Sequence, residues 1–108
     1  MDTPLTPLER VLVDMIAAEN WNNFRVDGIH AIRRENTGAG RFTYLEDSFG
    51  QRLRDGSYTA QGRLLEIEGV RDGLAFVIDV RDGKLRYLEL AVYGNEGWDG
   101  VERRWRIL

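Results

Sequence analysis

Five Asp-Gly pairs divide most of the chain into short segments that are rich in β-forming side chains. The pairs are Asp27-Gly28, Asp55-Gly56, Asp72-Gly73, Asp82-Gly83 and Asp99-Gly100. Asp-Gly readily adopts the positive φ angles of the type I′ turn, which closes two-residue hairpins. The pattern therefore predicts a mostly antiparallel sheet. We expect strands over residues 28–35, 41–46, 57–68, 73–81 and 84–93, a shorter one over 103–107, and a flexible turn over 36–40.

The segment before the first Asp-Gly pair carries the signals of a helix. Thr6-Pro7-Leu8-Glu9 is a capping box, in which the threonine hydroxyl and the Glu9 carboxylate each accept a bond from a free backbone N–H. Pro7 falls at the first helical position, where its missing N–H costs nothing. An apolar stripe follows at helical spacing: Leu8, Val11, Leu12, Met15 and Ile16. The sequence predicts a helix over residues 7–19 that buries one face.

Length and patterning together predict the fold class. A chain of 108 residues with 43% hydrophobic side chains supports one domain, residues 1–108, around one core. We expect an α+β domain in which the N-terminal helix packs on a twisted, mostly antiparallel sheet of five or six strands. A cystatin-like or half-barrel wrap is the nearest analogy.

The hairpin around Asp82-Gly83 raises a question about the sheet's second face. A regular two-residue loop places Asp79 opposite Arg86 and Glu89 opposite Phe76, and both faces are then largely apolar. A sheet with one wet face would alternate cleanly between polar and apolar side chains. Because one helix covers only one side, we expect a curled sheet or a second subunit, and hence a homodimer through the sheet, to cover the other.

Composition excludes several kinds of chemistry. The 15 basic and 18 acidic residues give a net charge of −3, which argues against a general binder of nucleic acid or of anionic membranes. The absence of cysteine removes disulfides, zinc–thiolate sites and thiol nucleophiles. The longest apolar run, residues 74–78, is far shorter than the roughly 20 residues that span a bilayer. We expect a cytoplasmic protein with no signal peptide, no membrane partner and no cofactor.

The residues suited to catalysis are few and lie on predicted strands. His30 is the only histidine and has no metal-binding motif beside it, so we predict no metal site and interpret it as a partly exposed strand residue. Glu89 shares a strand face with Tyr87, and burial of that face would raise the pKa of Glu89 unless a donor paired with it. A ligand-binding or enzymatic pocket between helix and sheet, centred on Glu89 with Tyr87 and His30, is therefore one interpretation.

The C-terminal end combines tryptophan with arginine. Trp98 lies in a turn-rich segment, where it either folds back over the core or is presented to a partner. Aromatic rings beside arginines have the composition of an interface hot spot. With no nucleophile or ligand set in the chain, the leading interpretation is a non-enzymatic module that binds a protein partner. Its candidate interface is Trp98, Arg103, Arg104, Trp105 and Arg106.

Three segments also carry a resemblance to other proteins. They are residues 38–45 (Gly-Ala-Gly-Arg-Phe-Thr-Tyr-Leu), 87–90 (Tyr-Leu-Glu-Leu) and 97–102 (Gly-Trp-Asp-Gly-Val-Glu). In these segments the chain resembles small bacterial proteins that form a domain of unknown function. Some similar α+β proteins belong to toxin–immunity systems, in which an acidic partner blocks a toxin. The resemblance implies an immunity-type inhibitor and brings no catalytic residue with it.

Overall fold

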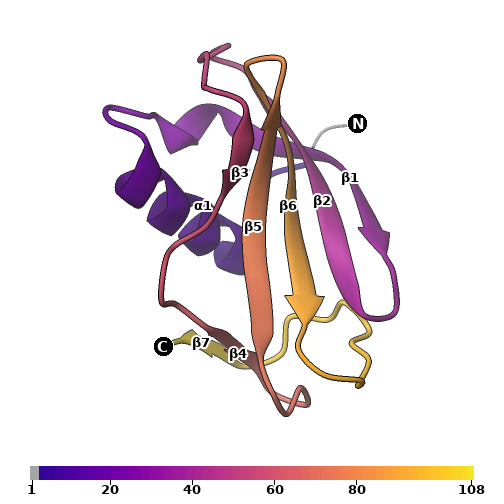
Figure 1. Cartoon of the computed structure of the whole chain (residues 1–108). Coiled ribbons are helices and arrows are strands. Elements are labelled where there is room, and N and C mark those ends of the chain that lie inside the picture. Colours follow the sequence, from indigo (N-terminus) through magenta and orange to yellow (C-terminus); the bar gives the residue numbers. More distant parts are fainter. Residues whose placement is uncertain (1–2) are drawn as a thin grey trace.

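The computed structural model describes residues 3–108, and Met1 and Asp2 lie outside the described residues. Its elements are helix α1 (Pro7–Asn20), the short 3₁₀ helix η1 (Val26–Gly28) and strands β1 (Ile29–Asn36), β2 (Gly40–Asp47), β3 (Gly56–Tyr58), β4 (Leu65–Ile67), β5 (Leu74–Arg81), β6 (Lys84–Val92) and β7 (Trp105–Ile107). Within residues 3–108 the strands form one seven-stranded sheet in the order β1-β2-β6-β5-β4-β7, and β3 also pairs with β5 (Figure 1). A helix packed on an antiparallel sheet confirms the predicted α+β class.

Helix α1 begins as its local sequence predicts. The backbone N–H of Glu9 donates to the Thr6 hydroxyl and that of Thr6 donates to the Glu9 carboxylate, which confirms the capping box. The buried face differs from the predicted stripe, because Val11 and Met15 are only half-buried. The buried residues of α1 are Leu8, Glu9, Leu12, Val13, Ile16 and Ala17. A carboxylate therefore lies in the middle of the apolar face.

The predicted strand over residues 57–68 is wrong, since two short strands take its place. Gly62 has a φ of +76° and the N–H of Arg63 donates to the carbonyl of Ala60, so the chain turns between them. Strands β3 and β4 pair with β5 at different places along its length. This division accounts for a sheet with more strands than the expected five or six.

Only one of the five Asp-Gly pairs closes a two-residue hairpin. Asp82 and Gly83 have φ angles of +55° and +78°, as a type I′ turn requires, and they join β5 to β6. The pair Asp27-Gly28 lies in η1, whereas Gly56 begins β3. The segment over residues 36–40 does form the predicted turn, between β1 and β2, with Gly38 at a φ of +86°.

A β-bulge corrects the predicted register of the β5–β6 hairpin. Val80 pairs with Leu85 as expected, but Asp79 pairs with Tyr87, so Arg86 is the extra residue. Each later side chain of β6 then points to the face opposite to the predicted one. Glu89 lies opposite Val77 rather than Phe76. The large aliphatic side chains of both strands gather on one face: Leu74, Phe76, Ile78, Val80, Leu85, Leu88 and Leu90.

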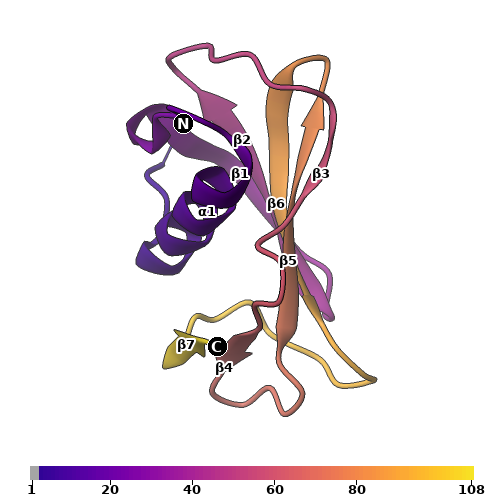
Figure 2. The ribbon, with the colours of Figure 1, turned by 60° about the vertical axis from the view of Figure 1, so that its left-hand side comes forward.

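The helix and this aliphatic face form the core. Helix α1 lies against one side of the sheet, and β4 and β7 turn toward that same side (Figure 2). Trp21 packs on the edge of this core with its ring centre 4.9 Å from that of Phe24. No helix or strand of residues 3–108 packs on the other side of the sheet (Figure 2).

Candidate functional site

The uncovered side of strands β1, β2, β6 and β5 presents side chains in rows that the strand register defines. The Arg33 row holds Arg33, Tyr44, Tyr87 and Asp79. The Glu35 row, two residues earlier on β2, holds Glu35, Phe42, Glu89 and Val77. The Gly40 row holds Gly40, Ala91 and Ala75. We call these three rows together the open face.

Three aromatic rings form the centre of the open face. The ring centre of Phe42 lies 5.0 Å from that of Tyr87 and 6.3 Å from that of Tyr44, and the two tyrosine rings lie 5.9 Å apart. All three side chains are half-buried. The Arg33 guanidinium lies 4.0 Å from the centre of the Tyr44 ring, within the range of a cation–π contact. This is a partly exposed apolar cluster with charged groups around it.

Burial and the neighbouring carboxylates both raise the pKa of the Tyr87 phenol. Burial raises its pKa above the ordinary value, and the carboxylates of Asp79 and Glu89 raise it further. The phenol therefore stays protonated at neutral pH and acts as a hydrogen-bond donor. At the edge of the cluster, the Tyr44 hydroxyl donates to the Glu35 carboxylate over 3.5 Å.

The pocket predicted around Glu89 does not lie between helix and sheet. Leu88 and Leu90 point to the core beside α1. Tyr87 and Glu89 alternate with them along β6, so their side chains point to the open face. His30 is partly exposed on β1, as predicted, and its Nε2 lies 3.4 Å from a Glu46 carboxylate oxygen. In the part of the chain that the structure describes, no group of three or more histidine, aspartate or glutamate side chains is placed to hold a metal ion.

The predicted C-terminal interface loses its central aromatic. Trp98 folds back into the core with 4% of its surface exposed, and its Nε1 donates to the carbonyl of Val101 over 3.0 Å. Both Nη atoms of Arg103 donate to the Asp99 carboxylate, over 2.9 and 2.7 Å. The exposed Arg103 and Arg106 thus pair with surface carboxylates of the same chain, Arg106 with Glu66.

The other two members of that interface remain accessible in part. Trp105 is half-buried and packs against the core, while Arg104 is exposed. They border a shallow hollow whose other lining includes Glu66, Glu68 and Val70. Because acidic and basic groups are mixed around this hollow, it offers a ligand no single charge and no aromatic cluster of its own.

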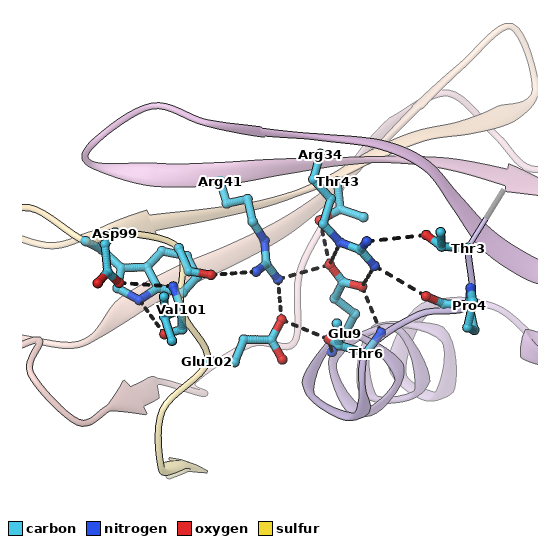
Figure 3. A network of polar contacts seen from close by, with 12 residues as sticks. Thr3, Pro4, Thr6, Glu9, Arg34, Arg41, Thr43, Asp99, Val101 and Glu102 are labelled. Carbon is cyan, nitrogen blue, oxygen red and sulfur yellow. Dashed lines mark hydrogen bonds and ion pairs between the residues drawn. The ribbon is translucent and has the colours of Figure 1, made fainter. Parts of the chain in front are cut away.

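A buried charge network lies on the core side of the sheet (Figure 3). Glu9 has no exposed surface, and its carboxylate accepts from Arg34 Nη2 over 2.6 Å and from Arg41 Nη2 over 3.0 Å. It also accepts from the Thr43 hydroxyl over 2.7 Å. Arg41 Nη2 donates in addition to Glu102, which precedes β7. The network joins α1, β1, β2 and the C-terminal segment.

The charged groups of this network pair with one another within the chain. Burial alone would raise the pKa of Glu9, but hydrogen bonds from Arg34, the Thr6 backbone and Thr43 outweigh it and hold the pKa below its ordinary value. The Glu9 bond in turn raises the pKa of Arg34. A fully buried, ionised carboxylate with its donors in place is suited to fixing α1 on the sheet, not to acid–base catalysis.

Sequence patterns carry a signal for part of this network. Glu9 lies three, four and seven residues before Leu12, Val13 and Ile16, so it falls on the buried helix face. Arg41 shares the parity of Leu45 on β2, which is buried. The inward position of Arg34, by contrast, depends on a bulge at Ile32 between Ala31 and Arg33, for which the sequence holds no clear sign.

The described residues include no helix long and apolar enough to cross a membrane. Comparison with protein-family models, curated proteins and solved structures found no match to this chain. The candidate functional site therefore depends on the geometry of the molecule alone, and that geometry favours the open face.

Proposed function

We propose that this protein is a non-enzymatic protein-binding module and that it binds through the open face. The observation that carries the proposal is the cluster of Phe42, Tyr44 and Tyr87, which α1 does not cover. Tyrosine and arginine are enriched among the residues that contribute most to protein interfaces. A half-buried aromatic centre surrounded by charged side chains has the arrangement of such an interface.

The chemistry of the open face defines the partner surface that would fit it. An apolar patch would cover the three rings, an acceptor would meet Arg33, and donors would meet Glu35 and Glu89. Two kinds of partner satisfy this description: another protein, as for an immunity-type inhibitor, or a second copy of the chain. In either case the protein acts by covering a surface rather than by a chemical step.

The contacts on the core side of the sheet support a binding role for the open face. The buried network commits Glu9, Arg34 and Arg41 to holding the helix in place. Trp98 is committed as well, since the Arg41 guanidinium lies 5.3 Å from the centre of its ring. Three aromatic side chains thus remain together on the open face, while the other exposed aromatics, Phe49 and Tyr93, lie apart from each other in the segments that follow β2 and β6.

Affinity capture from a lysate of the producing cells, with variant baits, tests the proposal. The Tyr44→Ala bait should retain much less of any captured protein than the wild type. Loss of a hot-spot side chain worth about 2 kcal/mol weakens binding by about 30-fold. The matched control is Arg104→Ala, which removes an exposed side chain of the C-terminal surface.

Both variants must show native circular dichroism and melting before capture is compared. Capture by Tyr44→Ala equal to that of the wild type would overturn the proposal, and reduced capture by Arg104→Ala would then return the binding surface to the C-terminal end. Arg33→Glu provides a second open-face bait. Its side chain is 58% exposed and its ion pair with Glu35, at 3.9 Å, is exposed as well, so the effect of the change on folding is small.

A further inference from the structure

The open face has a pattern that suits one particular partner. The Arg33 row and the Glu35 row lie side by side, and one carries hydrogen-bond donors where the other carries acceptors. The Arg33 row offers donors, the Arg33 guanidinium and the protonated Tyr87 phenol, on either side of the Tyr44 ring. In the Glu35 row the acceptors Glu35 and Glu89 lie on either side of the Phe42 ring. Within the chain Arg33 Nη1 lies 3.9 Å from a Glu35 carboxylate oxygen, and this long, exposed ion pair leaves both groups able to bind a partner.

This inference rests on the proposed function. From this pattern we infer that the partner is a second copy of the chain, bound face to face about a two-fold axis that lies across the strands between the two rows. A two-fold interface brings the same patch of both subunits together, so each contact occurs twice. Such an axis exchanges the rows, so that the donors of each copy meet the acceptors of the other.

Rotation about this axis determines which residues of the two copies meet. Arg33 meets Glu35 of the second copy, Tyr44 meets Phe42, and the Tyr87 hydroxyl donates to Glu89. The Tyr44 and Phe42 rings form the centre, with the ion pairs on the β1 side and the Tyr87–Glu89 hydrogen bonds on the β6 side. Asp79, at the outer end of its row, meets Val77 and gains no partner in this arrangement.

The same axis matches the shapes of the two ends of the face. It places the small residues of the Gly40 row over the end of the sheet that carries Glu46 and Arg81, whose side chains alternate with the buried Leu45 and Val80. Long side chains need the space that Ala91 and Ala75 leave, whereas the Leu90 carbonyl oxygen already fills the position of a Cβ on Gly40. Two sheets packed in this way keep their strands within about 30° of each other.

The area of the open face is sufficient for a dimer of modest affinity. Four strands spaced about 4.8 Å apart and about 26 Å long give a face of about 500 Å² in projection. A standard interface buries about 800 Å² of accessible surface per partner. Protruding rings and long side chains raise the accessible area above the projected one, so the open face falls at the lower end of the range for a specific dimer.

Sedimentation velocity over a wide range of concentration tests the inference with the full chain. The wild type should pass from monomer to dimer. Arg33→Glu places two carboxylates opposite each other twice per dimer, and should weaken association at least tenfold. The double exchange Arg33→Glu with Glu35→Arg restores the pairing across the axis and should restore the dimer. Arg104→Glu makes the same charge change off the open face and should leave association unchanged.

The outcomes separate this inference from the proposed function. A wild type that stays monomeric at every concentration overturns the second copy as partner, while the proposed function falls only if Tyr44→Ala captures protein as well as the wild type does. If Arg33→Glu breaks the dimer and Arg33→Glu with Asp79→Arg repairs it better than the Glu35 exchange, the axis runs along the strands, and the arrangement inferred here is wrong. Equal effects of Arg33→Glu and Arg104→Glu would also overturn it.

Discussion

Replacing Glu9 with glutamine should destabilise the protein severely, although the two side chains have nearly the same shape. The Glu9 carboxylate accepts five hydrogen bonds, one from the Thr6 backbone, two from Arg34 and one each from Arg41 and Thr43. The amide of glutamine replaces one acceptor oxygen by an NH₂ donor, which would face guanidinium donors. The change also removes the charge that compensates the buried Arg41, which is only 5% exposed.

The structure gives the size of this effect. Removal of one partner from a buried ion pair costs about 3–5 kcal/mol, because the other charge is left uncompensated. Glu102 still pairs with Arg41, so we expect the lower part of that range. A domain of this size has a total stability of about 5–15 kcal/mol, and the loss corresponds to a fall in Tm of about 15–25 °C.

Urea unfolding followed by tryptophan fluorescence and circular dichroism measures the free energy of unfolding. Asp14→Asn is the matched control, since Asp14 lies on the same helix with 51% of its side chain exposed, in an ion pair with Arg10. Its cost should stay below about 0.5 kcal/mol. If Glu9→Gln costs less than about 1 kcal/mol, the network does not hold the helix on the sheet, and the reasoning fails.

Three further predictions concern the stability of the fold. Because the folded state lowers the pKa of Glu9 below 4.5, its contribution is complete above that pH and is lost as the pH falls below it, so wild-type and Glu9→Gln stabilities should converge in acid unfolding series. Trp98→Ala should cost about 3–5 kcal/mol in urea unfolding, since the ring is buried, whereas Arg104→Ala should change the stability by no more than about 0.5 kcal/mol. Gly40→Ala would place a Cβ 2.1 Å from the Leu90 carbonyl oxygen, and overpacking of about 1–3 kcal/mol should appear as a lower Tm.

Local signals allowed the helix and most strands to be predicted. The capping box at Thr6 and Glu9 involves neighbours in sequence, and its geometry needs no distant partner. Likewise, Asp82-Gly83 specifies its own turn because both residues adopt positive φ angles there. The break in the segment over residues 57–68 could not be predicted from β propensity alone, since β5 selects which parts of it pair.

The side-chain faces were harder to predict than the strands themselves. A bulge adds one residue to one strand, and its position depends on the partner strand rather than on the local sequence. The bulge at Arg86 moved Glu89 from an expected place opposite Phe76 to the open face, and that at Ile32 turned Arg34 toward Glu9. For this reason the buried network escaped prediction, although Glu9 lay in plain helical register with Leu12 and Ile16. A sheet face left uncovered by the helix was expected, but the side chains that it carries were not.

The burial of Trp98, which lies in a loop, was also hard to predict from the sequence. Composition alone could not decide between a folded-back and a presented ring, because the deciding contacts come from distant residues. The backbone N–H of Trp98 donates to Gly38 in the turn between β1 and β2, and the guanidinium of Arg41 lies beside its ring. The burial that follows moves the candidate interface away from the C-terminal end.

Amide NMR spectra recorded over a dilution series test the central claim most directly, because they show which surface meets a second protein. We predict concentration-dependent shifts that are confined to β1, β2, β5 and β6 and are largest around Tyr44, Tyr87 and Glu89. Shifts centred on residues 98–106 would contradict the claim, as would spectra that do not change with concentration while Tyr44→Ala captures protein as well as the wild type does.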